Sequence, residues 1–169
     1  MSNPRIISGS ARGIRLQPVP GDITRPITDR VKEAVFNILS PDIVGANFLD
    51  MFGGTGSVGI EALSRGADSA TFIDLHSQAV NVIKANLITT HLEKKATVHQ
   101  MDAFRFISAP ATKKFDYIYI APPQYKQMWL TALHLVDEHM EWLVDDGWVI
   151  VQIHPVEFEE VTLKNLVEI

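Results

Sequence analysis

Cysteine is absent from the 169-residue chain. Without a thiol the protein has no disulfide bond, no thiolate metal ligand and no cysteine nucleophile. Long apolar runs are absent too, because no segment approaches the roughly 18 uninterrupted apolar residues of a membrane span. The first residues also lack the apolar core of a signal peptide. We therefore expect one domain over residues 1–169, cytoplasmic and not inserted in a membrane.

Basic residues are outnumbered, since 15 Lys and Arg stand against 20 Asp and Glu. Six of them lie in residues 1–32 beside only two acids, so the remainder of the chain is strongly acidic. A basic segment on an acidic body suits a polyanion bound at one face, although a solvated basic face gives the same pattern. The candidates for phosphate contacts are Arg12, Arg15, Arg25 and Arg30, because a guanidinium binds phosphate in bidentate fashion. The last two could instead order a loop over a cofactor.

The apolar pattern predicts an α/β domain with a mostly parallel, doubly wound sheet. Residues 1–27 are basic and rich in Gly and Pro, which is typical of a short hairpin or arm outside the core. In the core, 28–169, the first helix should begin after the N-cap Thr28 and carry Val31, Val35 and Ile38 on one stripe. Helices then alternate with five expected strands, and ligands of such sheets bind at the carboxyl ends of the strands. The expected strands are 46–52, 69–74, 96–100, 115–121 and 147–153.

A glycine-rich loop follows the first of these strands. Gly54, Gly56 and Gly59 satisfy the G-x-G-x-x-G spacing, which alone is weak support for a dinucleotide site. Asp50 stands directly before the loop, where a carboxylate would repel a pyrophosphate and attract a cationic ligand. S-adenosylmethionine is such a ligand, since it carries an ammonium and a sulfonium and has no phosphate. A purely structural role for Asp50, bonding loop amides, stays open.

Two further acids end the next two strands. Asp74 could accept hydrogen bonds from ribose hydroxyls or cap the following helix. Asp102 could accept from an adenine amino group, and it is equally well placed as the N-cap of the short helix after it. Acids at the ends of three successive strands are much rarer by chance than any one of them, so together they favour a nucleoside cofactor.

The fourth strand runs into the turn Ala121-Pro122-Pro123-Gln124-Tyr125. With this turn the chain resembles, over essentially its whole length, the RsmD-type 16S rRNA (guanine-N2)-methyltransferases. The matching stretches are RIISGSARGIRL, TRPITDRVKEAVFNIL, LDMFGGTGSVGIEALSRGA, Asp74, Asp102-Ala103 and the two prolines. The TRPITDRVKEAVF block separates this family from other methyltransferases. The resemblance implies a Rossmann-like class I methyltransferase fold and S-adenosylmethionine as cofactor.

The resemblance also implies roles for single residues. The cofactor would contact Asp50, Phe52, Gly53, Gly54, Gly56, Asp74, Asp102 and Ala103. The catalytic pocket for a flipped-out guanine would be formed by Pro122, Pro123, Gln124 and Tyr125. Flipping is needed because a base inside a duplex cannot present its N2 amino group to the sulfonium methyl. The partner would be small-subunit rRNA or the ribosomal subunit, and the protein a monomer without metal.

Two features depart from the family pattern. The family has Asp or Asn before the prolines and an aromatic residue directly after them, whereas this chain has Ala121 and places Tyr125 one residue later. The missing acceptor would cost on the order of 2–4 kcal/mol in rate unless another group, such as the Gln124 amide, replaces it. Family members also generally add a final strand antiparallel to the fifth, which residues 157–169 are not expected to form.

Two alternatives remain open from the sequence alone. A non-catalytic RNA- or ribosome-binding relative that keeps the cofactor fold is motivated by Ala121. A nicotinamide oxidoreductase is motivated only by the glycine spacing. No metal is expected, because His134 and His139 do not share a helix face and no carboxylate cluster completes a site. The tryptophans are expected in the core or the pocket wall: Trp129, Trp142 and Trp148.

Overall fold

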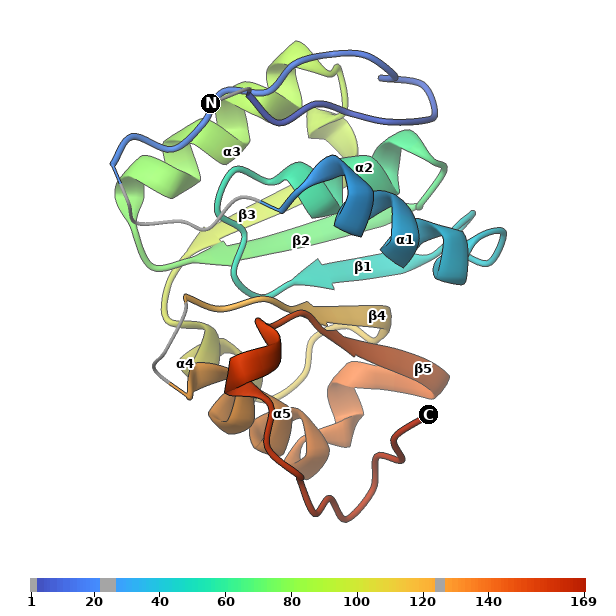
Figure 1. Cartoon of the computed structure of the whole chain (residues 1–169), viewed down its shortest axis with the longest axis vertical. Helices are drawn as coiled ribbons and strands as arrows, with labels where there is room; N and C mark the ends of the chain where they lie inside the picture. Colours follow the sequence, from blue (N-terminus) through green and yellow to red (C-terminus); the bar gives the residue numbers. More distant parts are fainter. Residues whose placement is uncertain (1–2, 22–26, 124–126) are drawn as a thin grey trace.

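A five-stranded parallel sheet lies between two layers of helices in the computed structural model, which describes residues 3–21, 27–123 and 127–169 (Figure 1). The strands are β1 (Asn47–Asp50), β2 (Ser69–Asp74), β3 (Ala96–Gln100), β4 (Phe115–Ile120) and β5 (Leu143–Val151), in the order β3-β2-β1-β4-β5. The α-helices are α1 (Asp29–Leu39), α2 (Ser57–Ser64), α3 (Ser77–Thr89), α4 (Ala103–Ser108) and α5 (Met128–Glu138). The predicted doubly wound α/β fold is confirmed, and the strand order reverses between β1 and β4.

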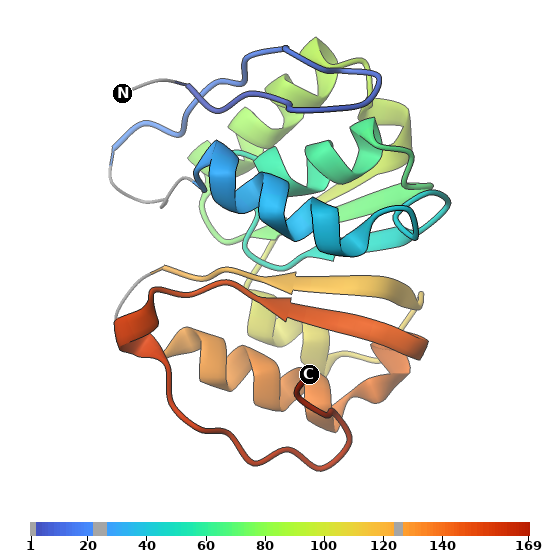
Figure 2. The ribbon, with the colours of Figure 1, turned by 45° about the vertical axis from the view of Figure 1, so that its right-hand side comes forward.

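Both faces of the sheet are covered, as the apolar composition of its central strands requires. Phe48 and Leu49 are consecutive in β1, fully buried, and belong to different clusters of the core. The first cluster joins the sheet to α1, α2 and α3, and in it the rings of Phe36 and Phe48 lie 6.4 Å apart. The second joins it to α4 and α5 around Trp142, and the two layers are separated in Figure 2.

The basic arm forms the predicted hairpin, with an antiparallel bridge between Arg5 and Arg15. The expectation that the arm lies outside the core is wrong, however, because Ile6 and Leu16 are almost completely buried. The hairpin lies along α2 and α3 in both views of the ribbon (Figures 1 and 2). It therefore completes the core on that side of the sheet.

A buried carboxylate joins the arm to two helices. Glu61 of α2 is fully buried and accepts hydrogen bonds from the backbone N–H groups of Ile7 and Ser8 at 2.9 and 3.0 Å. It also forms ion pairs with Lys32 of α1 at 3.1 Å and with Arg65 at 2.8 Å. Lys32 is 1% exposed, and burial lowers the pKa of its ammonium although Glu61 opposes that shift.

Lys32 explains why the buried face of α1 differs from the predicted one. Thr28 is the N-cap as expected, accepting from the Val31 N–H at 3.2 Å. Val31 and Ile38 of the predicted stripe are nevertheless exposed, at 38% and 68%. The buried positions are instead Lys32, Phe36 and Leu39. The face of α1 that packs on the core is therefore the one on which the Lys32 ammonium can pair with Glu61.

The segment after β5 contains no strand within residues 152–169 and is held by apolar packing and by hydrogen bonds to one buried carboxylate. The carboxylate of Asp137, at the end of α5, accepts from the N–H groups of residues 164–166 at 2.7 to 2.8 Å. Burial of this carboxyl raises its pKa, but the three donors outweigh it and the net pKa is lowered. Trp129 and Trp142 are buried as predicted, whereas Trp148 is 40% exposed on the edge strand β5. None of the described helices is long and apolar enough to cross a membrane.

Replacement of the buried ammonium should destabilise the whole domain. Lys32→Met leaves Glu61 buried with Arg65 and two backbone donors, so we expect a loss of about 3 kcal/mol in the free energy of unfolding by urea. Arg5→Gln is the control, because it removes the exposed Arg5–Asp29 ion pair and should shift the midpoint far less. Equal losses from the two variants would contradict the role given to Lys32.

Candidate functional site

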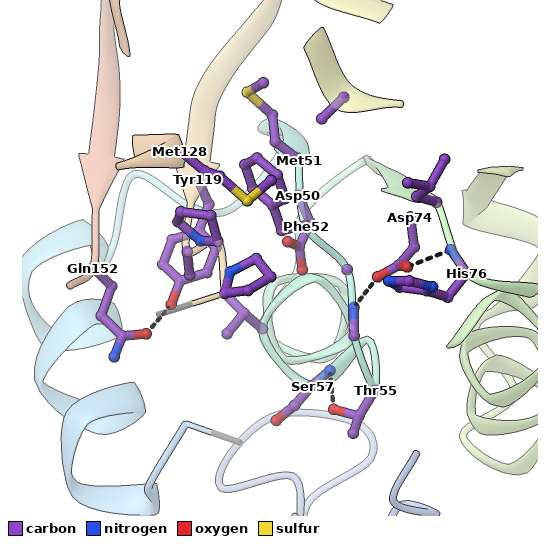
Figure 3. A pocket seen from close by; sticks show the side chains of 18 of the residues that line it. Asp50, Met51, Phe52, Thr55, Ser57, Asp74, His76, Tyr119, Met128 and Gln152 are labelled. Atoms are coloured by element: carbon purple, nitrogen blue, oxygen red, sulfur yellow. Dashed lines mark hydrogen bonds between the residues drawn. The ribbon is translucent and has the colours of Figure 1, made fainter. Parts of the chain in front are cut away.

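A pocket opens at the carboxyl ends of the parallel strands, where ligands of doubly wound sheets bind. Residues that follow each of the five strands line it, together with the start of α2 (Figure 3). Of the predicted site residues, it contains these: Asp50, Phe52, Gly53, Gly54, Asp74, Asp102, Ala103, Pro122 and Pro123. Gly56 does not line the pocket and acts on its shape instead. Gln124 and Tyr125 lie outside the described residues.

The glycine loop turns sharply between β1 and α2. Gly56 is the N-cap of α2 at a φ of 83°, a left-handed conformation that suits glycine. Gly59 lets α2 lie against the sheet, since a Cβ there would meet the Phe72 ring at 2.3 Å. Backbone geometry therefore requires the glycine at 56, and helix packing requires the glycine at 59. Both requirements hold whichever ligand the loop binds, so these two glycines do not identify the ligand.

Asp50 is the polar group in the pocket that most clearly lacks a partner. Its side chain is 1% exposed, and Oδ1 has no hydrogen-bond partner among the described residues. Burial raises the pKa of this carboxyl to about 8, against the N–H groups of Gly59 and Phe52, which lower it. The nearby Asp74 carboxylate raises it further. A purely structural Asp50 would have both oxygens satisfied, so the orphaned oxygen points to a cationic or hydrogen-bond-donating ligand.

The other two acids combine a local structural role with a place in the pocket. Asp74 accepts from the Gly54 N–H through Oδ2 and from the His76 N–H through Oδ1, both at 2.9 Å. It thereby ties the glycine loop to the end of β2. Asp102 is the N-cap of α4 and accepts from the Phe104 N–H at 2.9 Å, which confirms that reading of the sequence. Both still line the pocket, and each carboxylate oxygen keeps a second lone pair for a ligand.

The far end of the pocket, beyond β4, carries Ala121 and the two prolines. Ala121 is half-buried and supplies no polar side-chain atom there. Tyr119 and Gln152 line the same pocket, and the Tyr119 hydroxyl donates to Oε1 of Gln152 at 2.7 Å (Figure 3). Neither was singled out from the sequence, since a tyrosine inside an apolar strand and a glutamine after another carry no motif.

Asn86 of α3 was also missed and supports the glycine loop from behind. It is 1% exposed, and its Nδ2 donates to the Thr55 carbonyl in the loop at 2.8 Å. The same amide pairs with the backbone of Gln17 in the arm, accepting from its N–H at 2.7 Å and donating to its carbonyl at 3.1 Å. Ser57, in the pocket wall, similarly accepts from Lys32 at 2.9 Å. The arm and the loop are thus connected through two buried polar side chains.

The predicted phosphate contacts lie on the surface. Arg12, Arg15 and Arg30 are exposed, and Arg25 falls outside the described residues. Within the described ranges no group of three or more His, Asp or Glu could hold a metal ion. The pocket lining is rich in carboxylates, which accept hydrogen bonds and carry negative charge. Such a lining suits the ammonium and hydroxyls of S-adenosylmethionine and repels the pyrophosphate of a nicotinamide cofactor.

The chain can be compared with known proteins. A family model described as "Conserved hypothetical protein 95" matches residues 4–169. "Putative rRNA methyltransferase YlbH" of Bacillus subtilis is 41% identical over 150 residues, which are 88% of this chain and 81% of that protein. "Ribosomal RNA small subunit methyltransferase D" of Haemophilus influenzae is 36% identical over 150 residues, 88% of this chain and 77% of that protein. The solved structure "Putative methyltransferase yhhF from Escherichia coli" has a TM-score of 0.81 and 36% identity, covering 95% of this chain and 85% of that one.

The raised pKa of Asp50 predicts that binding of S-adenosylmethionine depends on pH. An ammonium requires the charged carboxylate, so binding releases a proton and the affinity should rise by up to about tenfold per pH unit from about pH 6 to about pH 7.5. Calorimetry in two buffers of different ionisation enthalpy measures both affinity and proton release. Asp50→Asn should weaken binding and abolish its pH dependence, whereas Asp68→Asn, an exposed control, should change neither. A steep pH dependence in Asp50→Asn would refute the assignment.

The Asn86 bridge predicts a loss of cofactor affinity from a change outside the pocket. Asn86→Asp keeps the acceptor for Gln17 but turns a carboxylate oxygen toward the Thr55 carbonyl, so the loop should shift. We expect the affinity for S-adenosylmethionine to fall by about tenfold, which corresponds to about 1.4 kcal/mol. Asn81→Asp, exposed on the same helix, is the matched control and should bind normally. Unchanged affinity in a folded Asn86→Asp variant would show that the loop does not depend on this bridge.

Proposed function

We propose that this chain, which belongs to the conserved hypothetical protein 95 family, transfers a methyl group from S-adenosylmethionine to small-subunit rRNA. The family match confirms the resemblance to RsmD-type proteins found in the sequence, and the solved structures confirm the Rossmann-like fold. Relatives named as ribosomal RNA methyltransferases support the substrate class. We assign the exocyclic N2 amino group of a guanine as the acceptor, because the resemblance to the RsmD-type family implies it.

The observation that carries the proposal is the orphaned oxygen of Asp50. A buried carboxylate oxygen without a partner is unfavourable, and Asp50 lies directly before a glycine loop that admits close approach of a ligand. An α-ammonium would satisfy that oxygen. In the same pocket Asp74 would accept from ribose hydroxyls and Asp102 from the adenine amino group, since both acids keep accepting capacity. S-adenosylmethionine supplies the electrophilic methyl group when bound.

The chain's contribution to the transfer is chiefly alignment and exclusion of water. The amino nitrogen attacks the methyl carbon, the electron pair of the carbon–sulfur bond stays on sulfur, and one amino proton passes to bulk solvent after the transfer. Pro122 and Pro123 suit the acceptor side, because proline fixes φ and lacks an N–H, so this turn has a preset backbone without amide donors at these two positions. The base would enter flipped out of its helix.

RNA would be held by the arm. Arg12 and Arg15 of the hairpin and Arg30 at the start of α1 are exposed, and arginine pairs well with phosphate. The arm itself is fixed to α2 and α3 by Glu61 and Asn86, so contacts made there would be positioned relative to the pocket. Arg25, Gln124 and Tyr125 keep their roles as sequence-based proposals.

A second candidate function is a non-catalytic RNA-binding relative that retains the cofactor pocket. It is motivated by Ala121, which places a methyl group where the family pattern has an acceptor. The two candidates share the cofactor and the RNA, and they differ only in whether a methyl group is transferred.

Transfer of labelled methyl from S-adenosylmethionine to small ribosomal subunits that lack the family's modification distinguishes the two. We expect label at one site, on guanine N2 after digestion to nucleosides, and none on large subunits treated in parallel. Asp50→Asn should reduce the signal through weaker cofactor binding. No label on subunits or naked rRNA, with cofactor binding confirmed in the same samples, would establish the non-catalytic candidate.

A further inference from the structure

The pocket has two chemically different ends. The end formed by β1, β2 and β3 carries the three acids assigned above to the cofactor. Around the ends of β4 and β5 the described lining is otherwise apolar, made of Ala121, Pro122, Pro123 and Met128. Tyr119 and Gln152 are the polar side chains that the described part of the chain contributes to that end.

The sheet register places Gln152 beside Ala121. Tyr119 pairs with Ile150 and Ile120 with Val151, so the next pair is Ala121 and Gln152. The Gln152 N–H continues the ladder by donating to the Ile120 carbonyl at 2.9 Å. Because side chains alternate along a strand, Tyr119, Ala121 and Gln152 share one face of the sheet. The glutamine is therefore the polar cross-strand neighbour of the position at which alanine offers none.

Tyr119 holds the amide of Gln152 in one orientation. The tyrosine ring is 2% exposed and lies 6.3 Å from the ring of Phe48, so the hydroxyl that donates to Oε1 has a fixed position. An amide oxygen has two lone pairs and an amide nitrogen has two protons, so this bond leaves capacity on both atoms. Gln152 is half-buried, which allows a ligand in the pocket to reach it.

We propose that Gln152 binds the amino-bearing edge of the acceptor base and determines which group is methylated; this rests on the proposed function. Oε1 accepts from one N–H of the guanine N2 amino group, and Nε2 donates to the adjacent ring nitrogen N3, a bidentate arrangement of the kind that glutamine forms with nucleobases. The bond to Oε1 directs the nitrogen lone pair toward the methyl carbon. The nitrogen–carbon bond then forms, and the electron pair of the carbon–sulfur bond stays on sulfur. The amino proton that was bonded to Oε1 is released to bulk solvent. Tyr119 acts through Gln152 and is a positioning residue.

The test compares Gln152→Leu, Tyr119→Phe and the double variant in methyl transfer to unmodified small subunits. We expect kcat to fall by about 100-fold in Gln152→Leu and by about tenfold in Tyr119→Phe, with the dissociation constant of S-adenosylmethionine within about twofold of wild type. The double variant should be no slower than Gln152→Leu, because Tyr119 acts through the glutamine. Gln100→Leu, the same change on an exposed residue at the end of β3, is the matched control and should leave kcat unchanged.

Gln152→Glu separates an orienting role from a merely structural one. A carboxylate accepts from the amino group but cannot donate to the ring nitrogen, so activity should return in part and kcat should rise with pH as this carboxyl ionises. Wild-type kcat in Gln152→Leu, or additive losses in the double variant, would overturn this inference alone. Absence of transfer by the wild-type protein would overturn the proposed function, and the inference with it.

Discussion

The buried carboxylate of Glu61 is the interaction on which the arrangement of this protein depends. Two backbone N–H groups of the arm, the ammonium of Lys32 and the guanidinium of Arg65 all converge on it. A charge in the core is tolerated only when it is fully paired, so the arm, α1 and α2 must be in place together. Lys32 also donates to Ser57 in the pocket wall, and the constraint therefore extends to the end of the glycine loop, where α2 begins. Asn86 makes the same connection on the other side of the arm.

The cofactor pocket has a cost that this scaffold must offset. The carboxyl of Asp50 has a pKa of about 8 in the folded chain and an ordinary value of 3.8, so folding stability falls as pH rises between those values. A residue chosen for stability would not be an acid with an orphaned oxygen. The proposed function explains it, because a ligand that carries a positive charge would regain the lost interaction. The contrast between Asp50 and the fully satisfied Glu61 separates a binding carboxylate from a structural one.

The sequence predicts local features of this molecule better than distant ones. Short patterns predict the five strands, the Thr28 and Asp102 caps and the position of the acids in the pocket, and the structure bears these out, although β5 begins at Leu143 and not at residue 147. The burial of Lys32 could not be predicted, because its partner Glu61 stands 29 positions away and an isolated Lys in a helix indicates an exposed face. Asn86 pairs across 69 positions for the same reason. Gln152 matters through its cross-strand neighbour, which only the register reveals.

The central claim is that the carboxylate-rich pocket binds S-adenosylmethionine with its ammonium on Asp50. A crystal structure with bound S-adenosylhomocysteine, the demethylated product, tests this claim most directly. The account predicts the product's amino group about 3 Å from Oδ1 of Asp50, its ribose hydroxyls on Asp74 and its sulfur facing the two prolines. A product bound in another orientation, with Oδ1 of Asp50 still lacking a partner, would contradict it.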